Sequence, residues 1–104
     1  MTTEIQGGPE TDHIHDTLIL RVRYIAARKP LVDETAQKNA SLAAIKPLVL
    51  RFFGLVEGGV DGGTKTYHFA LDGIVLTDLG ATLGFLADGK HELKLDFIER
   101  FEQG

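Results

Sequence analysis

The amino-acid sequence predicts a single α+β domain in which one helix packs across a mixed β-sheet. The chain has 104 residues, of which 43% are hydrophobic and 25% charged, and this suits one domain with an ordinary core. Several segments alternate apolar and polar residues, as half-buried strands do. Between them lies one segment whose apolar residues recur at the three- and four-residue spacing of a helix. We expect no internal repeat and no second domain.

The composition excludes several classes of protein. The absence of cysteine rules out a disulfide framework and thiol chemistry. A formal net charge of −4 argues against nucleic-acid binding, which needs a clustered basic face. No apolar run approaches the ~20 residues that span a bilayer, and residues 1–8 lack the basic start and apolar stretch of a signal peptide. We therefore expect a cytoplasmic protein with neither a nucleic-acid nor a membrane partner.

The N-terminal part of the chain predicts a tail and two strands. Residues 1–16 are mostly polar and are expected to form a flexible tail. The first strand begins at Thr17, and four of its residues share one apolar face: Leu18, Leu20, Val22 and Tyr24. A turn over residues 26–30 then leads to a short strand at residues 31–32, which the polar stretch 33–38 ends.

One helix is predicted in the middle of the chain, with Ser41 as a candidate N-cap. Its apolar positions are Leu42, Ile45, Val49 and one of Phe52 and Phe53. Pro47 costs ~3 kcal/mol inside a helix but is tolerated in the first turn. We therefore expect the regular helix over residues 47–56, with residues 43–46 as an irregular lead-in. Four helical residues are expected to face the sheet: Leu48, Val49, Phe52 and Leu55.

The second half of the chain predicts a loop, two strands and a short return strand. Residues 58–64 are glycine-rich and are expected to form a flexible loop. Asp72-Gly73 predicts a tight turn between a strand and a short strand over residues 74–76. Two longer strands are expected from alternating apolar residues. The first contains Tyr67, Phe69 and Leu71, and the last contains Leu93, Leu95 and Phe97. Residues 77–89 are expected to form a loop with four buried anchors: Leu79, Leu83, Phe85 and Leu86. This order of elements is that of a β-grasp sheet, in which the first and last strands close the sheet.

No group of residues predicts an active site, a metal or a cofactor. Ser41 is the only serine, and helix capping explains it better than nucleophilic catalysis does. His13 and His15 supply only half of a zinc site, with no cysteine to complete it. Residues 58–66 imitate a phosphate-binding loop, but Thr64 separates the lysine from the last glycine, and a helix precedes where a strand is needed. We therefore predict that the chain is not an enzyme.

Several segments of the C-terminal half resemble ubiquitin. A strand, glycine turn and short return strand read Phe69-Ala70-Leu71-Asp72-Gly73-Ile74-Val75-Leu76-Thr77-Asp78, a Thr-Leu step reads Ala81-Thr82-Leu83-Gly84, and a strand of alternating leucines reads Glu92-Leu93-Lys94-Leu95-Asp96-Phe97. Gln103-Gly104 follows at the end of the given sequence. Over residues 17–104 the chain looks like the bacterial ubiquitin-like proteins that accompany homologues of activating and conjugating enzymes.

This resemblance implies a β-grasp domain over residues 17–98 followed by a C-terminal tail over residues 99–104. It implies that the chain is a protein modifier: the Gly104 carboxylate is activated by an E1-like enzyme, passed to an E2-like enzyme and conjugated to a target. A peptidase is a further expected partner where a precursor extends beyond Gly104. The resemblance also implies a part in bacterial antiviral defence. Four tail residues are expected to contact the partner enzymes: Arg100, Phe101, Glu102 and Gln103.

The sequence departs from ubiquitin at two places, and other functions stay open. The positions that form ubiquitin's apolar recognition patch correspond here to Ala70 and Asp96, and the tail has one terminal glycine where ubiquitin has two. One alternative is a β-grasp interaction module that is never conjugated, because a fold does not by itself give a function. Another is a sulfur carrier that receives a thiocarboxylate at Gly104.

Overall fold

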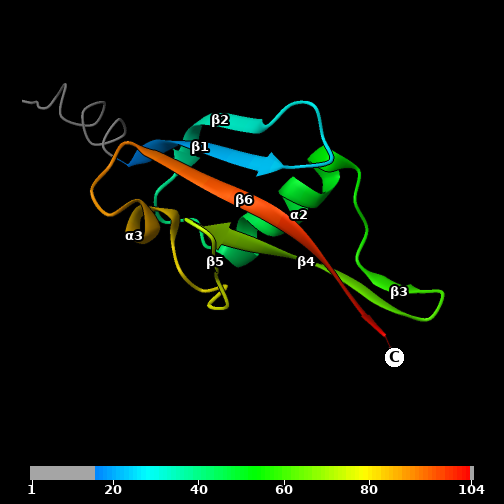
Figure 1. The fold of residues 1–104 in the computed structure, drawn as a ribbon. Helices are drawn as coiled ribbons and strands as arrows, with labels where there is room; N and C mark the ends of the chain where they lie inside the picture. Colours follow the sequence, from blue (N-terminus) through cyan, green and yellow to red (C-terminus); the bar gives the residue numbers. More distant parts are fainter. Residues whose placement is uncertain (1–15, 104) are drawn as a thin grey trace, which may run out of the picture.

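The computed structural model describes residues 16–103 and has an α+β fold, in which a curled mixed sheet lies against helix α2, with the short helix α3 at one end (Figure 1). The predicted N-terminal tail lies outside the described residues except for Asp16. The elements in chain order are β1 (Thr17–Tyr24), β2 (Leu31–Gln37), α2 (Leu42–Phe53), β3 (Gly58–Val60), β4 (Gly63–Leu71), β5 (Ile74–Val75), α3 (Leu83–Ala87) and β6 (Glu92–Gln103).

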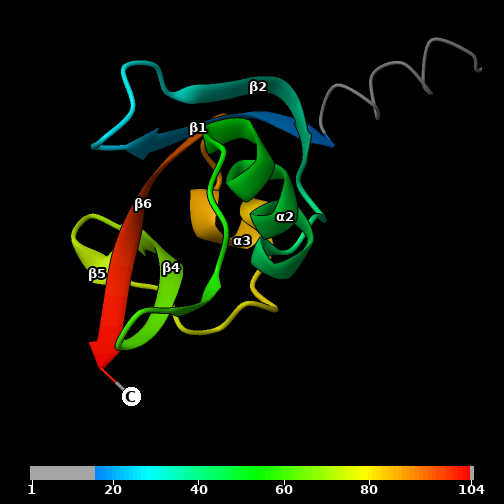
Figure 2. The same cartoon turned by 90° about the vertical axis from the view of Figure 1, so that its right-hand side faces the viewer.

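The sheet has the strand order β2-β1-β6-β4-β3, and β5 pairs with β4 beside this path. Strands β1 and β6 run parallel at its centre, from the pair Ile19 and Glu92 to the pair Tyr24 and Phe97. All other neighbours are antiparallel. A parallel pair needs a crossover connection, and here every element from β2 to α3 lies between the two strands in the sequence. Figure 2 shows α2 and α3 on the same side of the sheet.

The core confirms the alternation that predicted the long strands. The eight strand residues expected to face inward are all buried: Leu18, Leu20, Val22, Tyr67, Phe69, Leu93, Leu95 and Phe97. Phe69 and Phe97 have their ring centroids 4.9 Å apart, and the Phe97 ring stacks on that of Tyr67 at 5.5 Å. Burial of this apolar surface is the main stabilising contribution to the fold.

Strand β2 is longer than predicted. The polar stretch 33–38 was expected to end it, but residues 33–37 continue the strand beside β1, with Gln37 opposite Thr17. Only Ala36 of β2 is buried. Because β2 is an edge strand with little surface against the core, it needs no apolar alternation, and the sequence pattern therefore fails to reveal it.

Helix α2 starts five residues earlier than predicted, and Pro47 lies inside it. The Ser41 cap is confirmed, since its hydroxyl accepts from the Ala44 N–H at 3.1 Å. The N–H groups of Leu42 and Ala43 donate to the carbonyls of Ala81 and Leu79, at 3.0 and 2.9 Å. These distant partners satisfy the first turn, which otherwise leaves its N–H groups unpaired. The earlier start therefore depends on tertiary contacts.

The early start also changes the face of α2 that packs on the sheet. Leu42, Ile45 and Val49 are buried, and Leu55 after the helix is partly buried against the core. Leu48 and Phe52, which were predicted to face the sheet, are instead 55% and 54% exposed. The helix ends at Phe53, before the predicted end at residue 56, because its C-cap Gly54 adopts the left-handed conformation with φ +71°.

The glycine-rich segment after α2 forms a hairpin, although a flexible loop was predicted. Residues Gly58–Val60 form β3, which pairs with the first residues of β4 from Val60 opposite Gly63 to Gly58 opposite Lys65. The tight turn at Asp72-Gly73 is confirmed, with φ +51° and +84° at the two residues. It leads to β5 as predicted.

The predicted loop over residues 77–89 contains helix α3. Thr82 caps this helix by accepting from the Phe85 N–H at 3.3 Å. Leu83 is buried as predicted, and Leu86 is partly buried against the core. Two of the predicted anchors are exposed: Leu79 in part, and Phe85 with 77% of its surface. A helix of one turn presents only one side to the core, and Phe85 lies on the other.

Candidate functional site

Four of the predicted site residues, Arg100, Phe101, Glu102 and Gln103, lie at the end of strand β6. Residues 99–103 were expected to form a tail, but they continue β6 and pair with the start of β4. The pairs are Tyr67 with Glu99, Thr66 with Arg100, Lys65 with Phe101, Thr64 with Glu102 and Gly63 with Gln103. All five residues of this end of β6 are exposed. Gly104, the predicted conjugation residue, lies outside the described residues.

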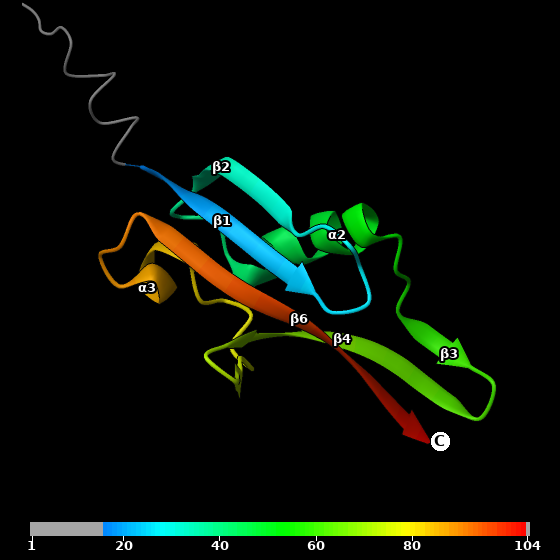
Figure 3. The same cartoon turned by 45° about the horizontal axis from the view of Figure 1, so that its top comes forward.

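This end of β6 has a neighbouring strand on one side only. Strand β1 accompanies β6 as far as the pair Tyr24 and Phe97 and then turns towards β2. Within residues 16–103, no strand pairs with residues 98–103 on the side that β1 leaves. Figure 3 shows β6 and β4 running on together beyond the end of β1 and beyond α2. We call the unpaired side of residues 99–103 the free edge of β6.

Glu99 is held by two tyrosines at the start of this segment. The hydroxyls of Tyr24 and Tyr67 both donate to Glu99 Oε1, at 3.3 and 3.2 Å. The two tyrosine rings meet edge to face, with centroids 6.1 Å apart. Burial of Tyr67, together with the charge of Tyr24 and Glu99 nearby, raises the pKa of its hydroxyl to about 12. Both hydroxyls therefore stay protonated donors at neutral pH.

The carboxylate of Glu57 contacts both β4 and helix α2. Glu57 accepts from the Tyr67 backbone N–H at 2.8 Å and forms an ion pair with Lys46 Nζ at 2.8 Å. Burial disfavours the charge on Glu57, but the Lys46 ammonium and the Tyr67 N–H outweigh it, and the pKa of Glu57 is lower than usual. Glu57, which lies between α2 and β3, therefore links Lys46 of α2 to the backbone of Tyr67 in β4.

Phe101 lies over Gly63, and the two positions fit only because residue 63 has no side chain. A methyl group at Gly63 would lie 2.1 Å from the carbonyl oxygen of Glu102 and 2.8 Å from Cζ of Phe101. Phe101 remains 45% exposed. The close approach of β4 and β6 at their ends therefore depends on glycine.

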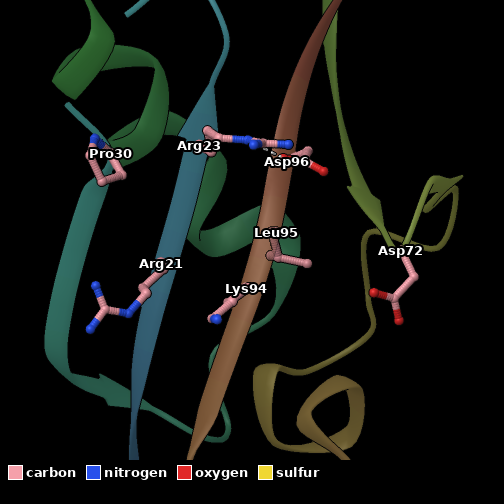
Figure 4. A pocket seen from close by; sticks show the side chains of 7 residues that line it. All are labelled: Arg21, Arg23, Pro30, Asp72, Lys94, Leu95 and Asp96. Atoms are coloured by element: carbon pink, nitrogen blue, oxygen red, sulfur yellow. Dashed lines mark hydrogen bonds and ion pairs between the residues drawn. The ribbon is translucent and has the colours of Figure 1, made fainter. Parts of the chain in front are cut away.

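The outer face of the sheet, opposite α2, carries paired charges. Arg21 of β1 forms an ion pair with Glu92 of β6, and Arg23 pairs with Asp96 at 3.0 Å. These residues alternate with the buried residues of the same strands, so they point away from the core. Figure 4 shows Arg23 reaching across to Asp96 at the rim of a pocket that Lys94 also lines. The Arg21 guanidinium holds the pKa of Glu92 below its usual value.

The two positions that correspond to ubiquitin's apolar patch lie directly opposite each other. Ala70 of β4 pairs with Asp96 of β6. Ala70 is buried, and Asp96 is engaged by Arg23. This part of the face therefore carries an ion pair, and Ile25, Val75 and Ile98 line the same hollow as Arg23 and Asp96.

The structure places two of the side chains that the sequence singled out for nucleophilic or acid–base chemistry. Ser41 is occupied as a helix cap, and His68 forms a hydrogen bond with the Thr66 hydroxyl at 3.1 Å. No three His, Cys, Asp or Glu side chains among residues 16–103 gather closely enough to hold a metal ion. His13 and His15 lie outside the described residues. Neither α2 nor α3 has the length and apolar character needed to cross a bilayer.

The sequence pattern indicates the inward position of Glu99 but not its contact with the two tyrosines. Glu99 continues the alternation of Leu93, Leu95 and Phe97, which places it on the inner face of β6. Tyr24 and Tyr67 belong to the inner faces of their own strands. Comparison with known proteins adds nothing to this geometry, since no protein-family model and no curated protein matches the sequence.

Proposed function

We propose that this chain is a ubiquitin-like protein modifier with a β-grasp fold, whose Gly104 carboxylate is activated and conjugated to a target. The observation that carries the proposal is the strand order β2-β1-β6-β4, in which β1 and β6 are parallel. In the sequence, α2 follows the first two strands and precedes the other strands of the sheet. This is the order expected of a β-grasp sheet closed by its first and last strands. It supports a role in which the exposed end of β6 presents the residue that follows it.

The chemistry of this role resides in the carboxylate and in the enzymes that act on it. A carboxylate is a poor electrophile, so its oxygen first attacks the α-phosphorus of ATP, forming an acyl-adenylate and releasing pyrophosphate. A cysteine thiolate of the activating enzyme then displaces AMP and forms a thioester, which an amine or hydroxyl of the target attacks. Glycine suits residue 104 because it lets the backbone approach the nucleotide closely. The chain is thus a substrate of enzymes and not an enzyme.

Activation in this role requires residues 99–103 to leave β4, because an enzyme channel takes up an extended single strand. The segment is exposed and has β4 on one side only. Among the described residues, three kinds of contact hold the segment in place. They are the strand pairing with β4, the hydrogen bonds from the two tyrosine hydroxyls to Glu99, and the contact of Phe101 with Gly63. Strand ends with few buried contacts open locally at low free-energy cost. Release of this segment is therefore compatible with an intact core.

The test is to incubate the chain with its cognate activating enzyme, ATP and Mg²⁺ and to look for a higher-mass band that a thiol reductant removes. Deletion of Gly104 should abolish the band and leave the melting temperature unchanged, since the core ends at Phe97. A matched control is deletion of residues 1–8, which should keep the band. A band that survives loss of Gly104, or no band with an enzyme shown to exchange pyrophosphate, would overturn the proposal.

A second function is favoured by the pairing of residues 99–103 with β4. If this segment stays bound, the chain is an interaction module that uses its sheet edges to bind a partner protein. The sheet edges in the described residues include those of the outer strands β2 and β3 as well as the free edge of β6. Hydrogen exchange separates the two functions: a modifier should exchange the amides of residues 99–103 far faster than those of Leu93 and Leu95, and a fixed module should protect both.

A further inference from the structure

Within residues 16–103, the free edge of β6 has no strand beside it. An exposed strand edge presents unpaired N–H and C=O groups, and natural proteins cover or disrupt such edges. Residues 99–103 contain neither a proline nor an irregularity in their register with β4. Phe101 lies at the middle of the segment, and 45% of its surface is exposed. The edge is therefore competent to take up a further strand.

The charges of Arg100 and Glu102 at this edge are complementary to those of a second copy of the same strand. In an antiparallel pair of two identical strands with Phe101 opposite Phe101, Arg100 of each copy lies opposite Glu102 of the other. Opposite charges directly across a strand pair are stabilising, and like charges are destabilising. Among residues 16–103, no ion pair joins Arg100 or Glu102 to another side chain. Both charges are therefore available to a second copy.

The same charges select one register. A continuous sheet keeps each side chain on its face only when the register shifts by two residues. A shift of two residues from the register centred on Phe101 places Arg100 of one copy opposite Arg100 of the other. The same shift in the other direction places Glu102 opposite Glu102. Only the register centred on Phe101 gives two attractive pairs, and it also places Gln103 opposite Glu99, where an amide can donate to the carboxylate.

The end of β1 leaves the space that this register needs. The last β1 pair is Tyr24 with Phe97, and Glu99 begins the unpaired part of β6. In this register Gln103 of the second copy lies opposite Glu99, two positions along β6 from the last β1 pair. Figure 1 shows β6 continuing past the arrowhead of β1.

We propose that two copies of this chain associate through the free edge of β6, in an antiparallel pairing centred on Phe101 that joins their sheets. Five residues from each copy form the interface, which makes the dimer weak and transient, as small interfaces are. The pairing occupies the segment that an activating enzyme must take up under the proposed function. A copy is therefore either paired or available for activation.

Charge reversal tests the pairing. Sedimentation equilibrium over a wide range of concentration should show the full chain rising from 11.4 kDa towards twice that mass. Arg100→Glu and Glu102→Arg should each abolish the rise, because like charges then face each other twice. The double variant Arg100→Glu with Glu102→Arg should restore it. An equimolar mixture of the two single variants should also associate, since one copy then presents two acids and the other two bases.

The variants leave the pairing within each copy intact. On β4 the residues opposite Arg100 and Glu102 are Thr66 and Thr64, which are uncharged. All variants should therefore melt at the wild-type temperature, and their association should weaken at high salt, which screens exposed charges. Wild-type chain that stays at the monomer mass at every concentration would overturn the proposal. Association that persists in both single variants would also overturn it, because the edge would then pair in another register or not at all.

Discussion

Pro47 is the sixth residue of α2 and offers a sharp test of the helix boundary. Without an N–H, it cannot donate to the carbonyl of Ala43 one turn earlier, and its ring crowds that carbonyl. Pro47 is exposed, so its side chain contributes little packing that a smaller residue would lose. Pro47→Ala therefore isolates the backbone effect of a proline inside a helix.

The expected gain in the free energy of unfolding follows from two opposing contributions. Proline in a helix interior is ~3 kcal/mol less favourable than alanine. Proline also restricts the unfolded chain, which favours it by ~0.4–1 kcal/mol. The difference predicts that Pro47→Ala stabilises the protein by about 2 kcal/mol. At ~4–8 °C per kcal/mol for a domain of this size, the melting temperature should rise by roughly 8–16 °C.

Urea denaturation measures this gain directly, as a higher midpoint with an unchanged slope. Pro30→Ala is a matched control, because Pro30 is exposed and precedes β2 outside any helix. It should change the free energy of unfolding by less than ~0.5 kcal/mol, as surface substitutions usually do. A midpoint for Pro47→Ala that stays within the range of this control would show that the helix begins near residue 47 and would refute the boundary at Leu42.

Three further outcomes follow from the core and from the end of β6. Phe69→Ala should destabilise the domain by ~3–5 kcal/mol, because Phe69 is fully buried; an unchanged denaturation midpoint would contradict its place in the core. Stability should fall as the pH rises from about 10 to about 12, because folded Tyr67 keeps its proton after unfolded tyrosine has lost it; Tyr67→Phe should flatten this part of the curve, and an equally steep curve would point to another group. Gly63→Ala should speed amide exchange in residues 99–103 and leave the core strands protected, because the new methyl group meets the Glu102 carbonyl; equal exchange in both proteins would show that this contact does not hold the strand end.

The sequence pattern predicted the parts of the fold in which one face of an element meets the core. The long strands were correct because Leu18, Phe69 and Leu95 and their neighbours alternate with polar residues. The start of α2 was not predictable, because its first N–H groups are satisfied by Leu79 and Ala81, which lie far along the chain. The residues around the start of the helix do not indicate partners that are distant in the sequence. The prediction that Pro47 lies in the first turn is therefore wrong.

The end of β6 was missed for a different reason. Residues 99–103 keep the alternation of the strand, but their inward positions carry Glu99, Phe101 and Gln103 in place of aliphatic residues. A polar residue on an inner face is stable only if it finds hydrogen-bond partners. Those partners, Tyr24 and Tyr67, are identified only once the strand order is known.

The most direct test of the proposed function is a search for the conjugation remnant in the cells that make this protein. Trypsin cleaves after Arg100, so a target joined to Gly104 retains the residues Phe101-Glu102-Gln103-Gly104 on its modified side chain. Mass spectrometry of tryptic peptides should find this four-residue branch on lysine or hydroxyl side chains of other proteins, and should not find it when the Gly104 codon is deleted. The proposed function is contradicted if residues 101–104 occur only as a linear peptide in cells where the activating enzyme is present and active.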